Sequence, residues 1–133
     1  MFQKMIEENH KNNIEVYSCG IYADNGDIPT ENAIETMKEY GVDLSKHRAT
    51  NIKNSEIEKM DIILCATLSH KMEVLRQYPQ LQGKVFTMKE YAGFVQEGRN
   101  YDIADPWGYD LETYKNCATE IQTCLERILF FTN

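Results

Sequence analysis

Basic residues are scarce in this 133-residue sequence, which has 14 Lys and Arg against 21 Asp and Glu and a formal net charge of −7. Nucleic acid is bound largely through Lys and Arg contacts to phosphates, so this balance disfavours a nucleic-acid partner. It leaves room for a local basic pocket around a phosphorylated ligand. The sequence also lacks an apolar run of the roughly 20 residues of a membrane helix, and its first residues are polar and amphipathic, unlike a signal peptide. We therefore expect no membrane partner and a cytoplasmic location.

Cysteine motifs with metal-binding or redox spacing are missing. The four cysteines stand at positions 19, 65, 117 and 124, and none belongs to a CxxC motif or a Cys/His cluster. Cys65 lies in an apolar run, whereas Cys117 and Cys124 fall on the apolar face of a predicted helix. We expect buried free thiols in a reducing compartment rather than disulfides, and we expect neither a metal site nor a cofactor.

Repeats, low-complexity tracts and long linkers are also absent, which favours a single domain over residues 1–133. Instead, helical and strand patterns alternate along the chain. The segments with helical patterns are 2–11, 31–40 after an N-cap at Thr30 and before Gly41, a short stretch near 54–59, a helix capped by Ser69 that ends at Pro79, and a last helix with an apolar stripe capped by Asp110. The predicted strands are 14–19, 61–67 and 84–88.

The alternation of these elements predicts an α/β fold, a three-layer αβα arrangement with a parallel sheet. The run DIILCAT at 61–67 is almost continuously apolar, which is typical of a strand buried on both faces. Such folds bind ligands beyond the carboxyl ends of their strands. We expect the loops that follow the strands, including the one that holds DIADPWG at 102–108, to lie at the functional edge.

A series of short motifs follows in order along the whole chain. They are Ser18-Cys19-Gly20, Pro29 with the helix 31–40, GVDLSKHRA (41–49), DIILCAT (61–67), HKMEVL (70–75), KVFTMKEY (84–91) and DIADPWG (102–108). In this order they resemble the low-molecular-weight protein phosphatases, the family of small tyrosine phosphatases and bacterial protein-arginine phosphatases. HKMEVL, KVFTMKEY and DIADPWG together resemble the bacterial branch that includes the arginine phosphatases. Each motif is weak by itself, but their ordered spacing is specific.

The resemblance implies roles for residues of the DIADPWG segment. Asp105 would be the general acid that protonates the leaving group and then activates water, and Trp107 would be a wall of the substrate pocket. The family often has Tyr or Phe at the position of Trp107, and Asp102 would be a supporting residue. The alternative interpretation is a plain Asp-Pro turn with an aromatic side chain plugged into the core.

Three further residues are candidates for support of the site. His47 and Arg48 resemble a His-Arg pair of the family, and His70 begins a predicted helix near the carboxyl edge of the sheet. For both His47 and His70, the favoured interpretation is a surface or helix-capping histidine.

The nucleophile loop of the family, a Cys, five residues, an Arg, then Ser or Thr and Pro, has no match in these 133 residues. The sixth residue after Cys19 is Asn25, and the sixth after Cys65 is Lys71, which lacks the planar fork that grips phosphate oxygens. The family places this loop between its first strand and first helix, and Met1 falls within a helical pattern. We therefore expect the first strand and the catalytic loop, roughly 18 residues by element length, to be absent ahead of Met1.

Two functions from different classes remain open. In the first, the gene product hydrolyses phosphotyrosine or phosphoarginine in protein substrates through a cysteinyl-phosphate, and this chain alone is inactive. In the second, the chain is a pseudophosphatase or interaction module, with homo-oligomers formed by strand swapping at unpaired strand edges. Arsenate reductase, a third function on the same fold, is disfavoured because residues 66–110 contain no cysteine that could resolve an intermediate.

Overall fold

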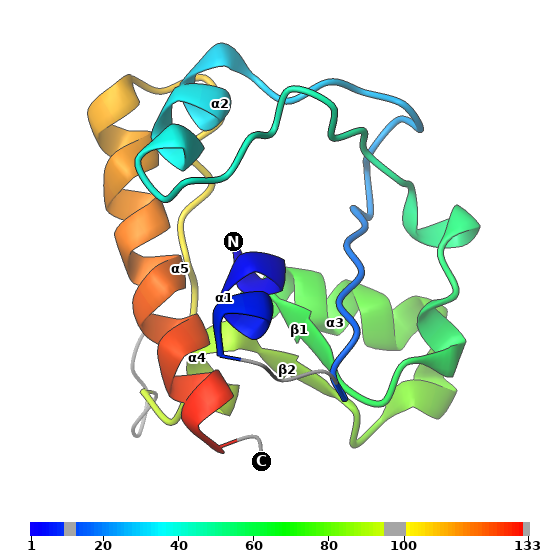
Figure 1. Cartoon of the computed structure of the whole chain (residues 1–133). Coiled ribbons are helices and arrows are strands. Elements are labelled where there is room, and N and C mark those ends of the chain that lie inside the picture. Colours follow the sequence, from blue (N-terminus) through cyan, green and yellow to red (C-terminus); the bar gives the residue numbers. More distant parts are fainter. Residues whose placement is uncertain (10–12, 95–100, 132–133) are drawn as a thin grey trace.

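Helices alternate with two short strands along the chain (Figure 1). The structure, a computed structural model, describes residues 1–9, 13–94 and 101–131. The elements in chain order are α1 (Phe2–Glu8), α2 (Glu31–Lys38), the 3-10 turns η1 (Ile52–Asn54) and η2 (Ile57–Lys59), β1 (Ile63–Cys65), α3 (Leu68–Gln77), the 3-10 turn η3 (Pro79–Leu81), β2 (Val85–Thr87), α4 (Met88–Tyr91) and α5 (Leu111–Phe131).

The strands β1 and β2 run parallel and form the sheet of the described part of the chain. Their register places Leu64 opposite Phe86, and the Ile63 N–H donates to the Lys84 carbonyl at 2.8 Å. A parallel pair needs a crossover connection, which α3 and η3 supply here. The α/β fold with a parallel sheet that the alternating patterns predict is therefore present.

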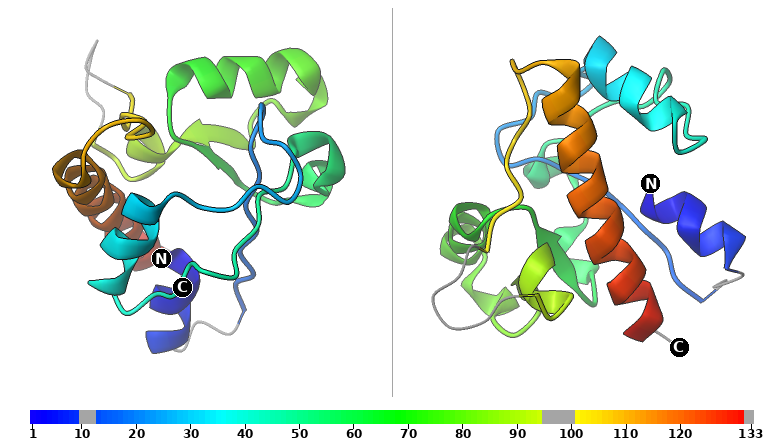
Figure 2. Two further views of the ribbon diagram at one scale, coloured as in Figure 1. Left: turned by 90° about the horizontal axis from the view of Figure 1, so that it is seen from above. Right: turned by 90° about the vertical axis from the view of Figure 1, so that its left-hand side faces the viewer.

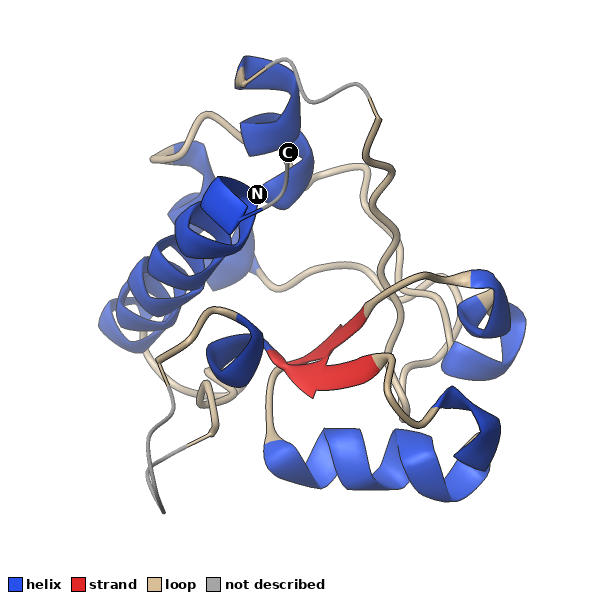
Figure 3. Cartoon of the chain, turned by 90° about the horizontal axis from the view of Figure 1, so that it is seen from below, coloured by secondary structure: helices blue, strands red, loops and turns tan. Residues whose placement is uncertain are grey.

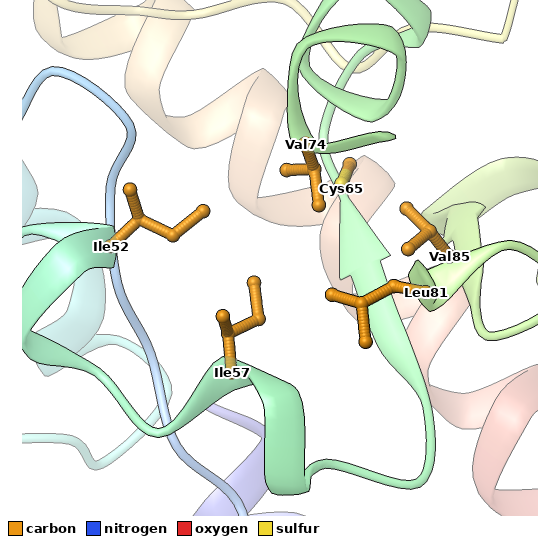
Figure 4. Close-up of a cluster of buried hydrophobic side chains, with 6 residues drawn as sticks. All are labelled: Ile52, Ile57, Cys65, Val74, Leu81 and Val85. Atoms are coloured by element: carbon orange, nitrogen blue, oxygen red, sulfur yellow. The ribbon is translucent and has the colours of Figure 1, made fainter. Parts of the chain in front are cut away.

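Helices lie on both faces of this sheet, with α3 on one side and α5 on the other (Figures 2 and 3). Successive side chains of a strand point to opposite faces, and β1 follows this rule. Leu64 packs on one group of buried residues and Cys65 belongs to the other. We call these groups the α5 cluster, which consists of Ala92, Ile103, Cys124 and Ile128, and the α3 cluster (Figure 4), which consists of Ile52, Ile57, Cys65, Val74, Leu81 and Val85.

The prediction of a strand at 14–19 is wrong. The segment is drawn as an irregular tube (Figure 1), and the bridge nearest to it within the described ranges joins Gly20 to Asn51. Around that bridge, the Gly20 N–H donates to the Thr50 carbonyl at 2.9 Å and the Ile52 N–H donates to the Gly20 carbonyl at 3.0 Å. A strand needs a neighbour that exchanges backbone hydrogen bonds, and residues 14–19 have no such neighbour among the residues that the structure describes.

The strand predicted over 61–67 is present but shorter. Only residues 63–65 are strand, Ile62 is 41% exposed, and Ile63 and Leu64 are half-buried. The apolar run therefore overstates both the length of the strand and its burial. The length of a strand depends on its partner, and β2 offers three residues for pairing.

Helix signals in the sequence were more reliable. The Thr30 hydroxyl accepts a hydrogen bond from the Ala33 N–H at 3.2 Å, which confirms the predicted N-cap of α2, and Gly41 follows the helix with a φ of +73°. The predicted cap of α3 at Ser69 is wrong. Thr67 is the cap, because its hydroxyl accepts from the His70 N–H at 3.0 Å.

Other predicted boundaries moved as well. The helix near 54–59 is replaced by η1 and η2. The helix predicted over 2–11 is α1 and ends at Glu8, and residues 10–12 lie outside the described residues. In the polar loop predicted over 93–109, residues 95–100 also lie outside them.

The last helix, α5, has the cap and the apolar stripe that the sequence predicts. The Asp110 carboxylate accepts from the Thr113 N–H at 3.0 Å and from its hydroxyl at 2.7 Å. No helix in the described ranges is long and apolar enough to cross a membrane. α5 packs against α1, α2 and α4, and the buried residues of its stripe are Tyr114, Cys117, Ala118, Cys124, Leu125, Ile128 and Leu129.

The short helix α4 was not predicted, and a capping box holds its start. The fully buried Thr87 accepts from the Glu90 N–H at 3.1 Å, while the Glu90 carboxylate accepts from the Thr87 N–H at 2.8 Å. Glu90 also pairs with Lys71 of α3 at 2.6 Å. Thr87 thus connects the end of β2 to α4, and Glu90 connects α4 to α3.

We expect Thr87→Ala to lower the free energy of unfolding by about 1–2 kcal/mol, because it removes the N-cap and half of the capping box. Urea denaturation followed by circular dichroism measures this loss. The matched control is Thr119→Ala on the exposed side of α5, where the hydroxyl donates only to the Lys115 carbonyl of its own helix. Equal stability of the two variants would contradict the role assigned to Thr87.

Candidate active site

The 102–110 loop, which holds the DIADPWG segment, is fastened to the sheet edge by its first two residues. The Asp102 Oδ1 atom accepts from the Leu68 N–H, the first amide of α3, at 2.7 Å. The Ile103 N–H donates to the carbonyl of Ala66, the residue directly after β1, at 2.8 Å. The Ile103 side chain is buried in the α5 cluster. The loop therefore starts at the carboxyl end of β1, where parallel α/β folds place their ligands.

The next residues of the loop form a turn that exposes Asp105. The Asp105 Oδ1 atom accepts from the Trp107 N–H at 3.0 Å, and the Tyr109 N–H donates to the Pro106 carbonyl at 2.9 Å. Gly108 completes the turn with a φ of +82°, which favours glycine. The Trp107 side chain is 72% exposed, so it is not a core plug. An acidic and an aromatic side chain thus stand at the surface on a backbone that is held from below.

The far end of the loop is joined to the start of α2. The Asn32 Nδ2 atom donates to the Tyr109 carbonyl at 3.3 Å, and the Thr30 hydroxyl lies 3.0 Å from the hydroxyl of the buried Tyr114 on α5. These contacts cross 77 and 84 residues of sequence. They place the start of α2 beside the 102–110 loop.

The remaining candidates divide into two groups. His70 is half-buried in the first turn of α3, two residues after the amide that Asp102 binds, so it lies at the same edge as the 102–110 loop. His47 and Arg48 are exposed in the loop after α2. The Arg48 guanidinium donates to the Ser45 and His47 carbonyls at 3.0 and 2.7 Å, within its own loop. Of the residues proposed from the sequence, Asp102, Asp105, Trp107 and His70 are therefore brought to one edge.

The cysteines behave as core thiols with one exception. Cys65, Cys117 and Cys124 are buried as predicted, whereas Cys19 is exposed, and all four are free thiols. Burial raises the pKa of Cys65 to about 11, so its thiol is protonated at neutral pH. Lys71 is the sixth residue after Cys65, where the nucleophile loop of the family has Arg, and it forms an ion pair with Glu90. These features oppose a nucleophilic role for Cys65.

The described residues were also compared with the requirements of a metal site. Residues 1–9, 13–94 and 101–131 contain no group of three or more His, Cys, Asp or Glu side chains that could hold a metal ion. An open depression at the end of α2 is lined by Ile34, Lys38, Gly41, Val42, Asp43 and Ser45, none of which belongs to the 102–110 loop.

Comparison with known proteins identifies the family. Residues 1–131 match the model of the low molecular weight phosphotyrosine protein phosphatases. The chain belongs to this family. It is 29% identical to a protein-arginine-phosphatase of Geobacillus stearothermophilus over 96% of this chain and 83% of that protein, and 32% identical to the probable low molecular weight protein-tyrosine-phosphatase EpsP of Ralstonia nicotianae over 82% and 70%.

The solved structures agree with this assignment. The low molecular weight protein tyrosine phosphatase of T. tengcongensis superimposes with a TM-score of 0.86 at 32% identity, over 97% of this chain and 84% of that one. The resemblance to the bacterial branch, which includes arginine phosphatases, is therefore confirmed. Members of this phosphatase family act on phosphorylated protein substrates.

Stability should fall at alkaline pH because of Cys65. Its pKa is about 11 in the folded chain against 9.0 for an ordinary thiol, so the unfolded chain loses this proton first. The contribution is fully present below pH 9 and is lost as the pH rises through 11. After allowance for solvent screening, we expect a loss of about 1–2 kcal/mol from this group.

Urea denaturation between pH 7 and pH 11 measures this loss. Cys65→Val should flatten the alkaline decline, whereas Cys19→Val should leave most of it, because burial is the first cause of the raised Cys65 pKa and the Cys19 charge only the second. An unchanged decline in Cys65→Val would show that the thiol is not its source.

Proposed function

We propose that this chain takes part in removing phosphate from phosphorylated tyrosine or arginine side chains of proteins, with Asp105 as the general acid and base. The observation that carries the proposal is the exposed Asp105 carboxylate on a turn whose preceding residues are hydrogen-bonded to the end of β1 and the start of α3. An acid must be reachable by substrate and yet held in place, and the 102–110 loop combines the two properties.

The chemistry assigns a task to each oxygen of Asp105. In the first step a thiolate attacks phosphorus, the bond from phosphorus to the leaving oxygen or nitrogen breaks, and Asp105 donates a proton to the leaving atom. In the second step water attacks the phosphorus of the cysteinyl-phosphate, the S–P bond breaks to release phosphate and return the thiolate, and the Asp105 carboxylate takes a proton from that water. Because Oδ1 accepts from the Trp107 N–H, we assign both proton transfers to Oδ2.

Trp107 supports the same assignment. Its backbone N–H donates to the Asp105 carboxylate, and the residue is 72% exposed. A large exposed aromatic side chain is costly unless something covers it, and the side chain of a phosphorylated residue has suitable apolar surface. We assign Trp107 to the wall of the substrate pocket. Asp102 and His70 would support the site from the start of α3.

The thiolate must come from outside these 133 residues, because none of their cysteines is followed six residues later by Arg. Cys65 is buried and protonated, and its neighbouring cation is paired. We infer that the 133-residue chain alone does not turn over phosphorylated substrates by a cysteinyl-phosphate route.

The test compares the chain with a chimera that carries a strand and a Cys-x5-Arg loop of the Geobacillus stearothermophilus arginine phosphatase ahead of Met1. We expect no phosphate release by the chain alone from phosphotyrosine or phosphoarginine peptides, and release by the chimera. In the chimera, Asp105→Asn should lower kcat by about 10²–10⁴-fold for poor leaving groups and less for good ones.

Asp110→Asn is the matched control for this chimera, because Asn caps a helix as well as Asp does and Asp110 caps α5. It should leave kcat unchanged. Equal effects of the two substitutions on kcat would contradict the assignment of Asp105 as the acid. So would an effect of Asp105→Asn that is the same for good and poor leaving groups. If the chain alone released phosphate and Cys65→Ser abolished this release, Cys65 would be identified as the nucleophile.

A second candidate function, assembly through strand edges, is favoured by the unpaired segment 14–19. Its sequence IEVYSC suits a strand, yet it lacks a strand partner within the described ranges. Extended segments with unpaired N–H and C=O groups recruit strands from other chains. We propose that two copies of this chain pair through this segment when concentrated.

Light scattering coupled to size exclusion should then show a dimer whose fraction rises with concentration. Proline removes a backbone N–H, and neighbouring N–H groups of a strand point to opposite edges. At least one of Val16→Pro and Tyr17→Pro should abolish the dimer. A monomer at all concentrations, or a dimer that survives both substitutions, would exclude this mode of assembly.

A further inference from the structure

One buried thiol makes a contact that the chemistry above does not use. The Cys117 Sγ atom, on the inner side of α5, lies 2.9 Å from the Ala104 carbonyl oxygen and donates its hydrogen to it. Cys117 is 7% exposed. The residue that follows Ala104 in the chain is Asp105, so the contact ends one peptide bond away from the proposed acid.

The planarity of the peptide bond makes this contact consequential. The Ala104 carbonyl and the Asp105 N–H share one rigid plane. A hydrogen bond that fixes the carbonyl therefore also fixes the position of the Asp105 Cα, which lies in the same plane. The two hydrogen bonds described above hold residues 102 and 103 of the loop. Neither of them fixes the orientation of the peptide plane between residues 104 and 105. Cys117 supplies that third point of attachment.

The chemical state of the thiol suits a donor. Burial raises the pKa of Cys117, and the nearby Glu120 and Asp105 carboxylates raise it further. The S–H therefore persists at neutral pH, although a thiol is a weaker donor than a hydroxyl. A nucleophilic or redox role would call for the opposite, a stabilised thiolate with access to solvent.

We propose that Cys117 is a positioning residue for Asp105, which it orients through the Ala104 carbonyl. The consequence for catalysis rests on the proposed function, but the contact can be tested on the 133-residue chain without turnover. Sequence spacing alone places Cys117 with the core residues of α5, and a core role requires only apolar volume. A positioning role requires a hydrogen-bond donor, and this difference decides between the two.

The experiment uses isotope-labelled chain and NMR. The probes are the carbonyl carbon shift of Ala104 and the solvent exchange rate of the Trp107 amide, which donates to Asp105. Cys117→Ala and Cys117→Val remove the donor, and the latter keeps the core filled if the former fails to fold. Cys117→Ser restores a donor. Cys124→Ala is the matched control, since it truncates another buried thiol of α5 two turns later.

We expect both donor-free variants to shift the Ala104 carbonyl resonance and to speed Trp107 exchange by about fivefold, the effect of one lost hydrogen bond. Cys117→Ser should return both probes toward their original values, even though a buried hydroxyl suits a core less well. Cys124→Ala should lower stability while leaving both probes unchanged. If Cys117→Val matches Cys124→Ala at both probes, or if Cys117→Ser behaves like Cys117→Val, the proposal is overturned.

The same substitutions separate this inference from the proposed function. In the chimera, positioning of an acid predicts that Cys117→Val lowers kcat for poor leaving groups more than for good ones, while KM stays constant. NMR changes without any effect on kcat would preserve the positioning of Asp105 but remove its role as acid. An effect on kcat without NMR changes would contradict the positioning itself.

Discussion

The parallel pairing of β1 with β2 is the constraint on which the rest of the structure depends. Each strand has three residues, yet each leads to a threonine that caps the next helix. β2 ends at Thr87, which caps α4, and β1 ends two residues before Thr67, which caps α3. The Ala66 carbonyl, which lies between β1 and α3, also receives the Ile103 N–H. Two helix starts and the 102–110 loop are therefore positioned by the same strand ends, and shifting the register by one residue would move all three.

Local signals in the sequence predicted local structure well. The N-caps at Thr30 and Asp110 and the apolar stripe of α5 depend on residues within a few positions of one another, and all are present. Strands depend on partners far along the chain, and there the prediction failed at 14–19 and overestimated 61–67. Alternating apolar residues predict that a segment can be extended, but not that a second segment will exchange hydrogen bonds with it.

The site follows the same division. The family resemblance of the DIADPWG segment led to the proposal of Asp105 and Trp107 as site residues, and the turn that carries them can be recognised in the sequence. The hydrogen bonds that hold the loop could not be predicted, because their partners, the Leu68 amide and the Ala66 carbonyl, are backbone groups that any residue carries. Cys117 was visible only as one member of an apolar stripe. Arg48 was proposed from sequence as a supporting residue, and in the structure its guanidinium donates to carbonyls of its own loop.

The net charge of the chain gives a physical reason why the proposed acid, Asp105, would need a separate phosphate-binding part beside it. The chain carries a net charge of −7, so its overall field opposes a phosphate dianion. The start of α3 is the natural local counterweight, since helix N-termini favour anions. Its first amide, however, is already bound by the Asp102 carboxylate, which fastens the loop. The hydrogen bond that holds the loop of Asp105 thus occupies an amide that could otherwise bind phosphate. Other amides and an Arg, from a nucleophile loop, would have to supply the phosphate-binding groups.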